Sequence, residues 1–197
     1  MTSIFSFLAK RRSFLLGILG APVAAAQAAS TSDKPLYEKP FGAFQNKSLE
    51  QKVQELADRE EIRELISRYA QGVAHGVSVA NLFTDDGGFI MGVPGSPDQE
   101  VKGRKELDKF YGTVVGTEGK TLPMIHNYLI EVSGVEATGL CSIEVRTSAD
   151  GKSMIGSGYY ADRYRKENGR WKFVVRDARM YHWVPLQEGW AKLSKAG

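Results

Sequence analysis

Hydrophobic residues recur at helical spacing in two stretches of the first half of the chain. From Leu49 onward they are spaced mostly by three and four residues, and the pattern stops at the glycines of 72–76. A shorter stretch of the same kind covers Gly103 to Val115. We expect a helix in each stretch, and the capping-box pattern that opens at Asp58 predicts a break or fresh start in the first one.

Apolar and polar residues alternate in the second half of the chain, which is the period of a β-strand. Tight turns are predicted at Ser133-Gly134, Asp150-Gly151 and Asn168-Gly169. Four strands joined by three such turns form an antiparallel meander, and helices followed by a sheet indicate an α+β fold. The expected strands are 124–132, 137–146, 153–166 and 170–182.

The segment between the two helical stretches has weaker patterns. We expect a helical turn at 79–83, a chain reversal at 84–88, a short strand at 89–91 and a surface loop at 92–100. These elements connect the helices without adding much to the sheet.

The first 28 residues have the pattern of an export signal. Lys10, Arg11 and Arg12 precede an apolar run that ends in small residues, and this run is too short to span a bilayer. The arginine pair resembles a twin-arginine signal, with a Sec-type signal as the alternative. We therefore predict a signal peptide at 1–28, a tether at 29–48, a domain at 49–185, a tail at 186–197 and a periplasmic location.

Charge and cysteine content exclude several classes of function. Removing the predicted signal takes away three of the 26 Lys and Arg and none of the 23 Asp and Glu, so 23 of each remain. A neutral domain has no basic surface for nucleic acid or for an anionic membrane. Cys141 is the single cysteine and lies in an apolar strand, where a buried unreactive thiol is expected. The three histidines are scattered, so we predict no metal site.

Four stretches, in order along the chain, carry a family resemblance. They are ADREEIRELISRYA at 57–70, LFTDDGGF at 82–89, HNYLIEV at 126–132 and GYYADRYRKENGRW at 158–171. Together they resemble the SnoaL-like branch of the NTF2-like superfamily, to which scytalone dehydratase, bile acid dehydratase and ketosteroid isomerase are related. The resemblance implies a cone, in which a curved antiparallel sheet wraps around N-terminal helices and encloses one deep pocket.

The resemblance also implies a catalytic site. Active members use a helix tyrosine, a strand histidine and polar groups on the last strands, and these positions match Tyr69, His126 and Arg179. In this interpretation His126 transfers the proton, while Tyr69 and Arg179 stabilise the oxygen that gains charge. A hydrogen-bonded structural role is the alternative for His126. The substrate-binding residues are predicted to be Tyr159, Tyr160, Asp177, Glu144 and Trp183.

Two points about carboxylates stay open at this stage. Strand alternation places Arg179 on the same face as Trp171, so an inward Trp171 implies an inward arginine, which needs an acidic partner or an anionic ligand. The carboxylate that the resemblance implies at the helix end falls at Ala74. The residues that could replace it are Glu144, Asp162, Asp177 and His75.

We therefore predict a lyase that needs no cofactor and acts by proton transfer on a hydrophobic, aromatic, hydroxylated small molecule. Dehydration is the first expectation, and isomerisation or carbon–carbon cleavage such as deformylation would use the same groups. The alternatives are a ligand carrier or sensor without catalysis, and an assembly subunit. A homodimer or homotrimer is compatible with each of these functions.

Overall fold

The computed structural model of the protein describes residues 35–39, 46–116 and 120–191. The predicted signal peptide lies outside the described residues, as does most of the predicted tether. In chain order the elements are η1 (Leu36–Glu38), α2 (Leu49–Ala74), η2 (Ala80–Leu82), β1 (Phe83–Gly92), β2 (Gln99–Lys102), α3 (Arg104–Val114), β3 (Thr121–Ser133), β4 (Glu136–Ala149), β5 (Lys152–Glu167) and β6 (Arg170–Pro185).

Helix α2 is continuous over 26 residues, so the predicted break at Asp58 is wrong. The helix begins at a capping box in which Ser48 and Gln51 satisfy each other's backbone N–H groups. Asp58 is buried within the helix and accepts hydrogen bonds from Lys166 Nζ at 2.7 Å and Trp171 Nε1 at 2.9 Å. Its carboxylate therefore fixes α2 to the β5–β6 hairpin instead of starting a helix.

The predicted meander is confirmed, and the fold is α+β as expected. Strands β3, β4, β5 and β6 pair antiparallel in sequence order, and the six-stranded sheet has the order β2-β1-β6-β5-β4-β3. The turn residues Asn168 and Gly169 have φ values of 50° and 75°, which is the backbone of a tight hairpin turn.

The region before the meander contributes more strand than predicted. The expected reversal at 84–88 lies inside β1, which begins at Phe83 and pairs in parallel with β6. The expected loop at 92–100 overlaps the start of β2, which runs to Lys102 and pairs antiparallel with β1. Asp85 and Asp86 project from β1 into solvent and form ion pairs with Arg104 and Arg165, respectively. Local turn composition was therefore overridden by pairing with a strand that is distant in sequence.

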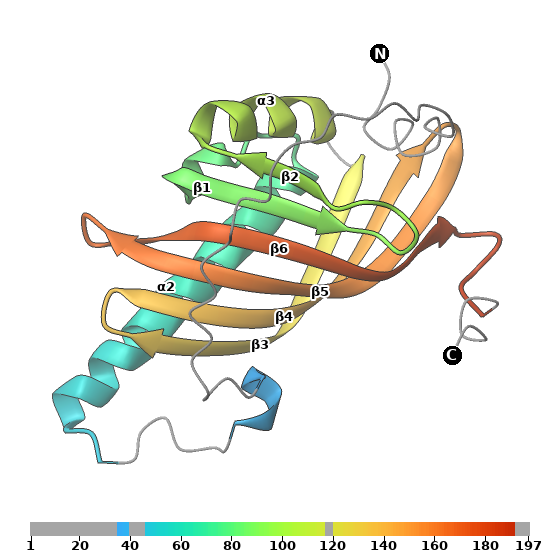
Figure 1. The fold of residues 1–197 in the computed structure, drawn as a ribbon. Coiled ribbons are helices and arrows are strands. Elements are labelled where there is room, and N and C mark those ends of the chain that lie inside the picture. The colour runs from blue at the N-terminus through green and yellow to red at the C-terminus, as the bar shows by residue number, and fades with distance from the viewer. Residues whose placement is uncertain (1–34, 40–45, 117–119, 192–197) are drawn as a thin grey trace, which may run out of the picture.

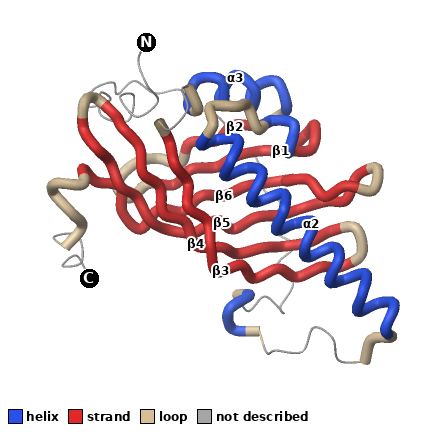
Figure 2. Tube along the Cα trace, turned by 180° about the vertical axis from the view of Figure 1, so that it is seen from behind, coloured by secondary structure: helices blue, strands red, loops and turns tan. Residues whose placement is uncertain are grey.

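The helices cover one face of the sheet, which we call the inner face. Figure 2 shows α2 crossing the strands diagonally on this face, and Figure 1 shows the opposite, outer face in front of α2. The core lies between α2, α3 and the inner face, and aromatic rings fill much of it. Tyr69, Phe83 and Phe173 form one contact group, with ring centroids 5.1 to 6.4 Å apart.

Bulges in β3 and β6 decide which residues reach the inner face. In β6, Phe173 pairs with Tyr164 and Val175 pairs with Arg163, so Val174 is an extra residue. Tyr181 is a second extra residue of β6, between Met180, which pairs with Gly158, and His182, which pairs with Ser157. In β3, the register shifts between His126 and Leu129, where Asn127 has a φ of 58°. An extra residue reverses the alternation of all side chains that follow it.

Candidate active site

The inner face carries a fully buried arginine, Arg176, because of the bulge at Val174 in β6. Trp171 and Phe173 are buried before the bulge, whereas Arg176 and Ala178 are buried after it. The guanidinium lies over three aromatic rings, 3.7 Å from the centroid of Tyr160, 4.1 Å from Tyr69 and 4.6 Å from Phe173. Such contacts stabilise a cation that has been removed from water.

A buried carboxylate faces this arginine. Asp162 on β5 pairs with Arg176 in the strand register, and its Oδ2 lies 3.7 Å from Arg176 Nη2. The same Oδ2 accepts a hydrogen bond from the Tyr164 hydroxyl at 2.9 Å. Gly139 on the neighbouring strand makes room for that tyrosine, since a Cβ at this position would lie 2.8 Å from the Tyr164 ring. The side chains of Asp162 and Arg176 are both 0% exposed.

The pair does not satisfy all of its own polar atoms. Asp162 Oδ1 and the Nε and Nη1 atoms of Arg176 are buried and have no hydrogen-bond partner among the described residues. Leaving such groups unpaired costs several kcal/mol when they are charged. A polar group of a ligand placed between these atoms would remove that cost.

Tyrosine hydroxyls extend the polar cluster towards the helices. Tyr111 of α3 donates a hydrogen bond to the Tyr69 hydroxyl at 3.2 Å, which leaves the Tyr69 proton available to another acceptor. Burial raises the pKa of Tyr69, although Arg176 and a hydrogen bond from Tyr111 act in the other direction. Tyr69 is therefore a proton donor at neutral pH and not a phenolate.

Burial also changes the acid–base character of Asp162 and Cys141. It raises the pKa of Asp162 from 3.8 to about 6, against the opposing effects of Arg176 and the Tyr164 hydrogen bond. A carboxylate with that pKa can accept a proton near neutral pH and release it again. Burial raises the pKa of the Cys141 thiol to about 12, which agrees with the predicted unreactive thiol.

Arg179 lies on the outer face, so the expectation that it points inward is wrong. Its Nη1 contacts Asp98 at 2.6 Å and its Nε contacts Asp177 at 2.7 Å, and 34% of its side chain is exposed. The cause is the extra residue Val174, which places Arg176 inward and Arg179 outward. Asp177 is therefore the partner of Arg179, and Asp162 is the carboxylate left facing the interior.

His126 also lies on the outer face. It is exposed and pairs with Ser142 of β4. Tyr128 and Ile130 follow the bulge and point to the inner face. Simple alternation along this strand would put His126 on the same face as Tyr128, but the register shift at Asn127 puts the two residues on opposite faces. The structure therefore does not bring His126, Tyr69 and Arg179 together, and only Tyr69 lies in the buried cluster.

The predicted substrate-binding residues divide between the two faces. Tyr160 is buried in the cluster, and Trp183 packs against the core. Tyr159 and Asp177 lie on the outer face, and so does Glu144, whose carboxylate pairs with Arg146 at 3.0 Å. Ala74 is the last residue of α2, and His75, its exposed C-cap, donates its backbone N–H to Gln71.

Sequence reasoning missed Arg176, although a signal for it exists. Apolar residues occupy odd positions at Trp171 and Phe173 and even positions at Ala178 and Met180. This change of parity within one strand indicates a bulge, and it places Arg176 with the inward residues.

A model of the SnoaL-like domain family matches residues 54–177, which is more than half of the chain. The chain belongs to the SnoaL-like domain family. The match includes Tyr69, Tyr160, Asp162 and Arg176 of the buried cluster. Among curated proteins, none matches this SnoaL-like chain significantly.

Solved structures support the NTF2-like fold of this SnoaL-like protein. A protein of unknown function from Mycobacterium tuberculosis is 27% identical, with a TM-score of 0.54 over 66% of this chain and 73% of that chain. A proposed scytalone dehydratase from Novosphingobium aromaticivorans is 21% identical, with a TM-score of 0.60 over 68% and 91%.

Hexachlorocyclohexane dehydrochlorinase from Novosphingobium barchaimii LL02 is 23% identical to this SnoaL-like chain, with a TM-score of 0.58 over 68% and 94%. Another solved structure in this group is described as an NTF2-like protein. The distant structural neighbours therefore include dehydratases and dehydrochlorinases. At these identities the likeness shows the fold and leaves the reaction of this SnoaL-like protein to be argued from its own residues.

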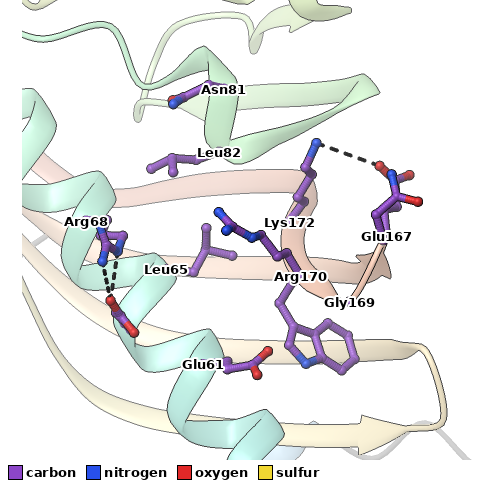
Figure 3. Close-up of a pocket in the computed structure, with 12 residues that line it drawn as sticks. Glu61, Leu65, Arg68, Asn81, Leu82, Glu167, Gly169, Arg170 and Lys172 are labelled. Atoms are coloured by element: carbon purple, nitrogen blue, oxygen red, sulfur yellow. Dashed lines mark hydrogen bonds and ion pairs between the residues drawn. The ribbon is translucent and has the colours of Figure 1, made fainter.

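The described part of this SnoaL-like protein contains no group of three His, Cys, Asp or Glu side chains that could hold a metal ion together. None of its described helices is long and apolar enough to cross a membrane. A surface cleft of about 860 Å³ lies between α2, η2 and the β5–β6 turn (Figure 3). Leu65 and Trp171, which belong to the same core as the buried cluster, contribute to its lining.

Proposed function

We propose that the protein is a lyase that needs no cofactor and eliminates water from a hydrophobic, aromatic small molecule carrying a hydroxyl group. The reaction is assigned to the buried cluster of Asp162, Arg176, Tyr69 and Tyr160. The proposal keeps the periplasmic location expected from residues 1–28. Structural neighbours described as a dehydratase and a dehydrochlorinase support elimination as the class of reaction.

One observation carries the proposal: an unpaired buried acceptor and unpaired buried donors belong to the same ion pair. Asp162 Oδ1 can accept a hydrogen bond, and Arg176 Nε and Nη1 can donate. A substrate hydroxyl can donate to Asp162, and a carbonyl oxygen of the same substrate can accept from Arg176, so a compound with both groups could satisfy both residues. A carbonyl or a halide has no proton to give to Asp162.

The aromatic surroundings favour a substrate with rings. The rings of Tyr69, Tyr160 and Phe173 surround the guanidinium of Arg176. They provide apolar and aromatic surface next to a small number of polar atoms, which is the composition of a small-molecule site. In a site without water, each of these polar atoms interacts more strongly with developing charge.

In the proposed reaction the substrate is a β-hydroxy carbonyl compound. The Asp162 carboxylate takes the proton from the carbon next to the carbonyl group, and the electrons of that C–H bond delocalise onto the carbonyl oxygen as an enolate. The same electrons form the new carbon–carbon double bond when the hydroxyl group leaves. Arg176 and the free proton of Tyr69 stabilise the carbonyl oxygen as it gains negative charge. The C–O bond to the hydroxyl then breaks, and the hydroxide leaves as water with the proton held by Asp162, which regenerates the carboxylate.

The test uses a panel of aryl β-hydroxyketones, whose dehydration gives conjugated enones that absorb in the near ultraviolet. Tyr69→Phe is expected to lower kcat/KM by about a hundredfold, because it removes a donor that acts in the transition state. Tyr159→Phe is the matched control, since Tyr159 lies on the outer face, and it should retain the activity of the parent.

Circular dichroism and thermal unfolding establish that each variant is folded before rates are compared. Equal activity of Tyr69→Phe and the parent would contradict the assigned site. Absence of enone formation by the parent with every member of the panel would contradict the proposed reaction.

A further inference from the structure

The cleft of Figure 3 lies outside the proposed active site and has its own polar groups. Its walls come from α2, from η2 and from the turn between β5 and β6. Figure 3 shows Arg170 extending from β6 across the cleft towards Leu65 and Arg68 of α2. Two arginines from opposite walls therefore approach the same space.

The two arginines differ in their partners. Arg68 forms an ion pair with Glu64 of the same helix at 2.5 Å. Arg170 forms no ion pair or hydrogen bond with the side chains of the described residues. The nearest acid along the hairpin, Glu167, instead accepts from Arg165 Nη2 at 2.8 Å.

A third cation at the cleft is only weakly neutralised. Lys172 Nζ lies 4.0 Å from Glu167 Oε2, at the limit of an ion pair. The other oxygen of Glu167 already holds Arg165. Arg170 and Lys172 are therefore two cations of one strand whose charges are not closely compensated at the cleft.

The floor of the cleft is apolar. Leu65 is 6% exposed and Trp171 is 5% exposed, and partly buried Leu82 lies beside them. The cleft thus combines an apolar floor with charged walls. Glu61, Glu64 and Glu167 line it together with the three cations. Glu64 pairs with Arg68, Glu61 lies 3.7 Å from Lys166, and Arg170 has no acidic partner among the described side chains. A volume of about 860 Å³ lies in the range of small-molecule sites.

We propose that this cleft is a second ligand site, which binds a small organic carboxylate. The carboxylate accepts hydrogen bonds from the Arg170 guanidinium, whose planar donors match two carboxylate oxygens, and Lys172 adds a second positive charge. The apolar part of the ligand lies on Leu65, Leu82 and the edge of Trp171. This site is independent of the elimination reaction proposed for the buried cluster.

The probe is 3-phenylpropionate, and its amide is the uncharged analogue. Binding to the full folded chain is measured by calorimetry and by changes in amide NMR shifts, at an ionic strength that screens long-range attraction. The carboxylate is expected to bind at least about tenfold more tightly than the amide, because hydrogen bonds from the guanidinium to a charged acceptor are stronger than those to a neutral one. The shift changes should be centred on Asn81, Gly169 and Trp171.

Arg170→Gln is expected to weaken carboxylate binding by about tenfold or more and to leave amide binding unchanged. Arg163→Gln is the matched control, because Arg163 is an exposed arginine of the same hairpin on the outer face, and it should bind like the parent. Equal loss in both variants would mean general attraction of anions and would overturn the proposal. Failure of the parent to bind, equal affinity for the amide, or shift changes centred on Tyr69 and Tyr160 would also overturn it.

Discussion

Replacing the buried ion pair by apolar residues should separate its effect on stability from its effect on catalysis. The variants are Arg176→Met, Asp162→Leu and the double replacement. Each single change leaves one buried charge without its partner, which typically costs about 3–5 kcal/mol. Arg176→Met also loses three cation–aromatic contacts at 3.7 to 4.6 Å, each contributing roughly 0.5–2 kcal/mol. Asp162→Leu also removes the acceptor of the Tyr164 hydroxyl, at about 1–3 kcal/mol.

The double variant contains no unpaired buried charge, so its destabilisation should be clearly smaller than the sum of the two single destabilisations. Simple addition of the two single costs would instead give about 8 kcal/mol or more, which exceeds the stability margin of many domains. Urea unfolding followed by tryptophan fluorescence gives the three free energies. Additive costs would refute the account of Arg176 and Asp162 as a coupled buried pair. Enone formation should be lost in all three variants, including the double variant.

Three further predictions concern pH, the α2 contact and the space beside Tyr164. Because the pKa of Asp162 is raised from 3.8 to about 6, Asp162 keeps its proton in the folded state between about pH 4 and about pH 6, whereas it loses the proton in the unfolded state. Asp162 should therefore lower the free energy of unfolding by up to about 1.4 kcal/mol per pH unit as pH rises from about 4 to about 6, and this contribution should be absent from Asp162→Asn in urea titrations. Asp58→Ala should destabilise the fold by about 2–4 kcal/mol, because Lys166 and the Trp171 indole lose a part-buried charged acceptor. A destabilisation below about 0.5 kcal/mol, measured by thermal unfolding, would contradict this role of Asp58. Gly139→Ala should displace Tyr164 and reduce enone formation, since the new methyl group would lie 2.8 Å from the Tyr164 ring and hydroxyl. Gly112→Ala is the control and should retain enone formation, because a Cβ at position 112 meets nothing within 4 Å.

The order of the elements could be predicted from the sequence because each depends on local patterns. The period of α2, the alternation of the meander and the turn residues at Asn168-Gly169 all act over a few positions. Strands β1 and β2 were underestimated, since the composition of 84–88 indicates a turn while pairing with β6 makes it a strand. Pairing between distant segments has no local signal in a single sequence.

The site could be predicted only in part, because it depends on two bulges. Tyr69 and Tyr160 lie in the buried cluster, where helical spacing and the strand alternation between the two register shifts of the β5–β6 pairing direct them. The family resemblance assigned His126 to the site and alternation with Trp171 placed Arg179 inward, but the bulges at Asn127 and Val174 leave both on the outer face. One extra residue per strand is sufficient to exchange an inward arginine for an outward one.

Proton exchange at the substrate carbon tests the central claim most directly. An aryl β-hydroxyketone is incubated in deuterated water, and deuterium incorporation next to the carbonyl group is followed by NMR with folded Asp162→Asn and His126→Ala. If Asp162 is the base, exchange should fall by about a hundredfold or more in Asp162→Asn and stay within a few-fold of the parent in His126→Ala. Loss of exchange in His126→Ala with retention in Asp162→Asn would contradict the account and move the chemistry to the outer face.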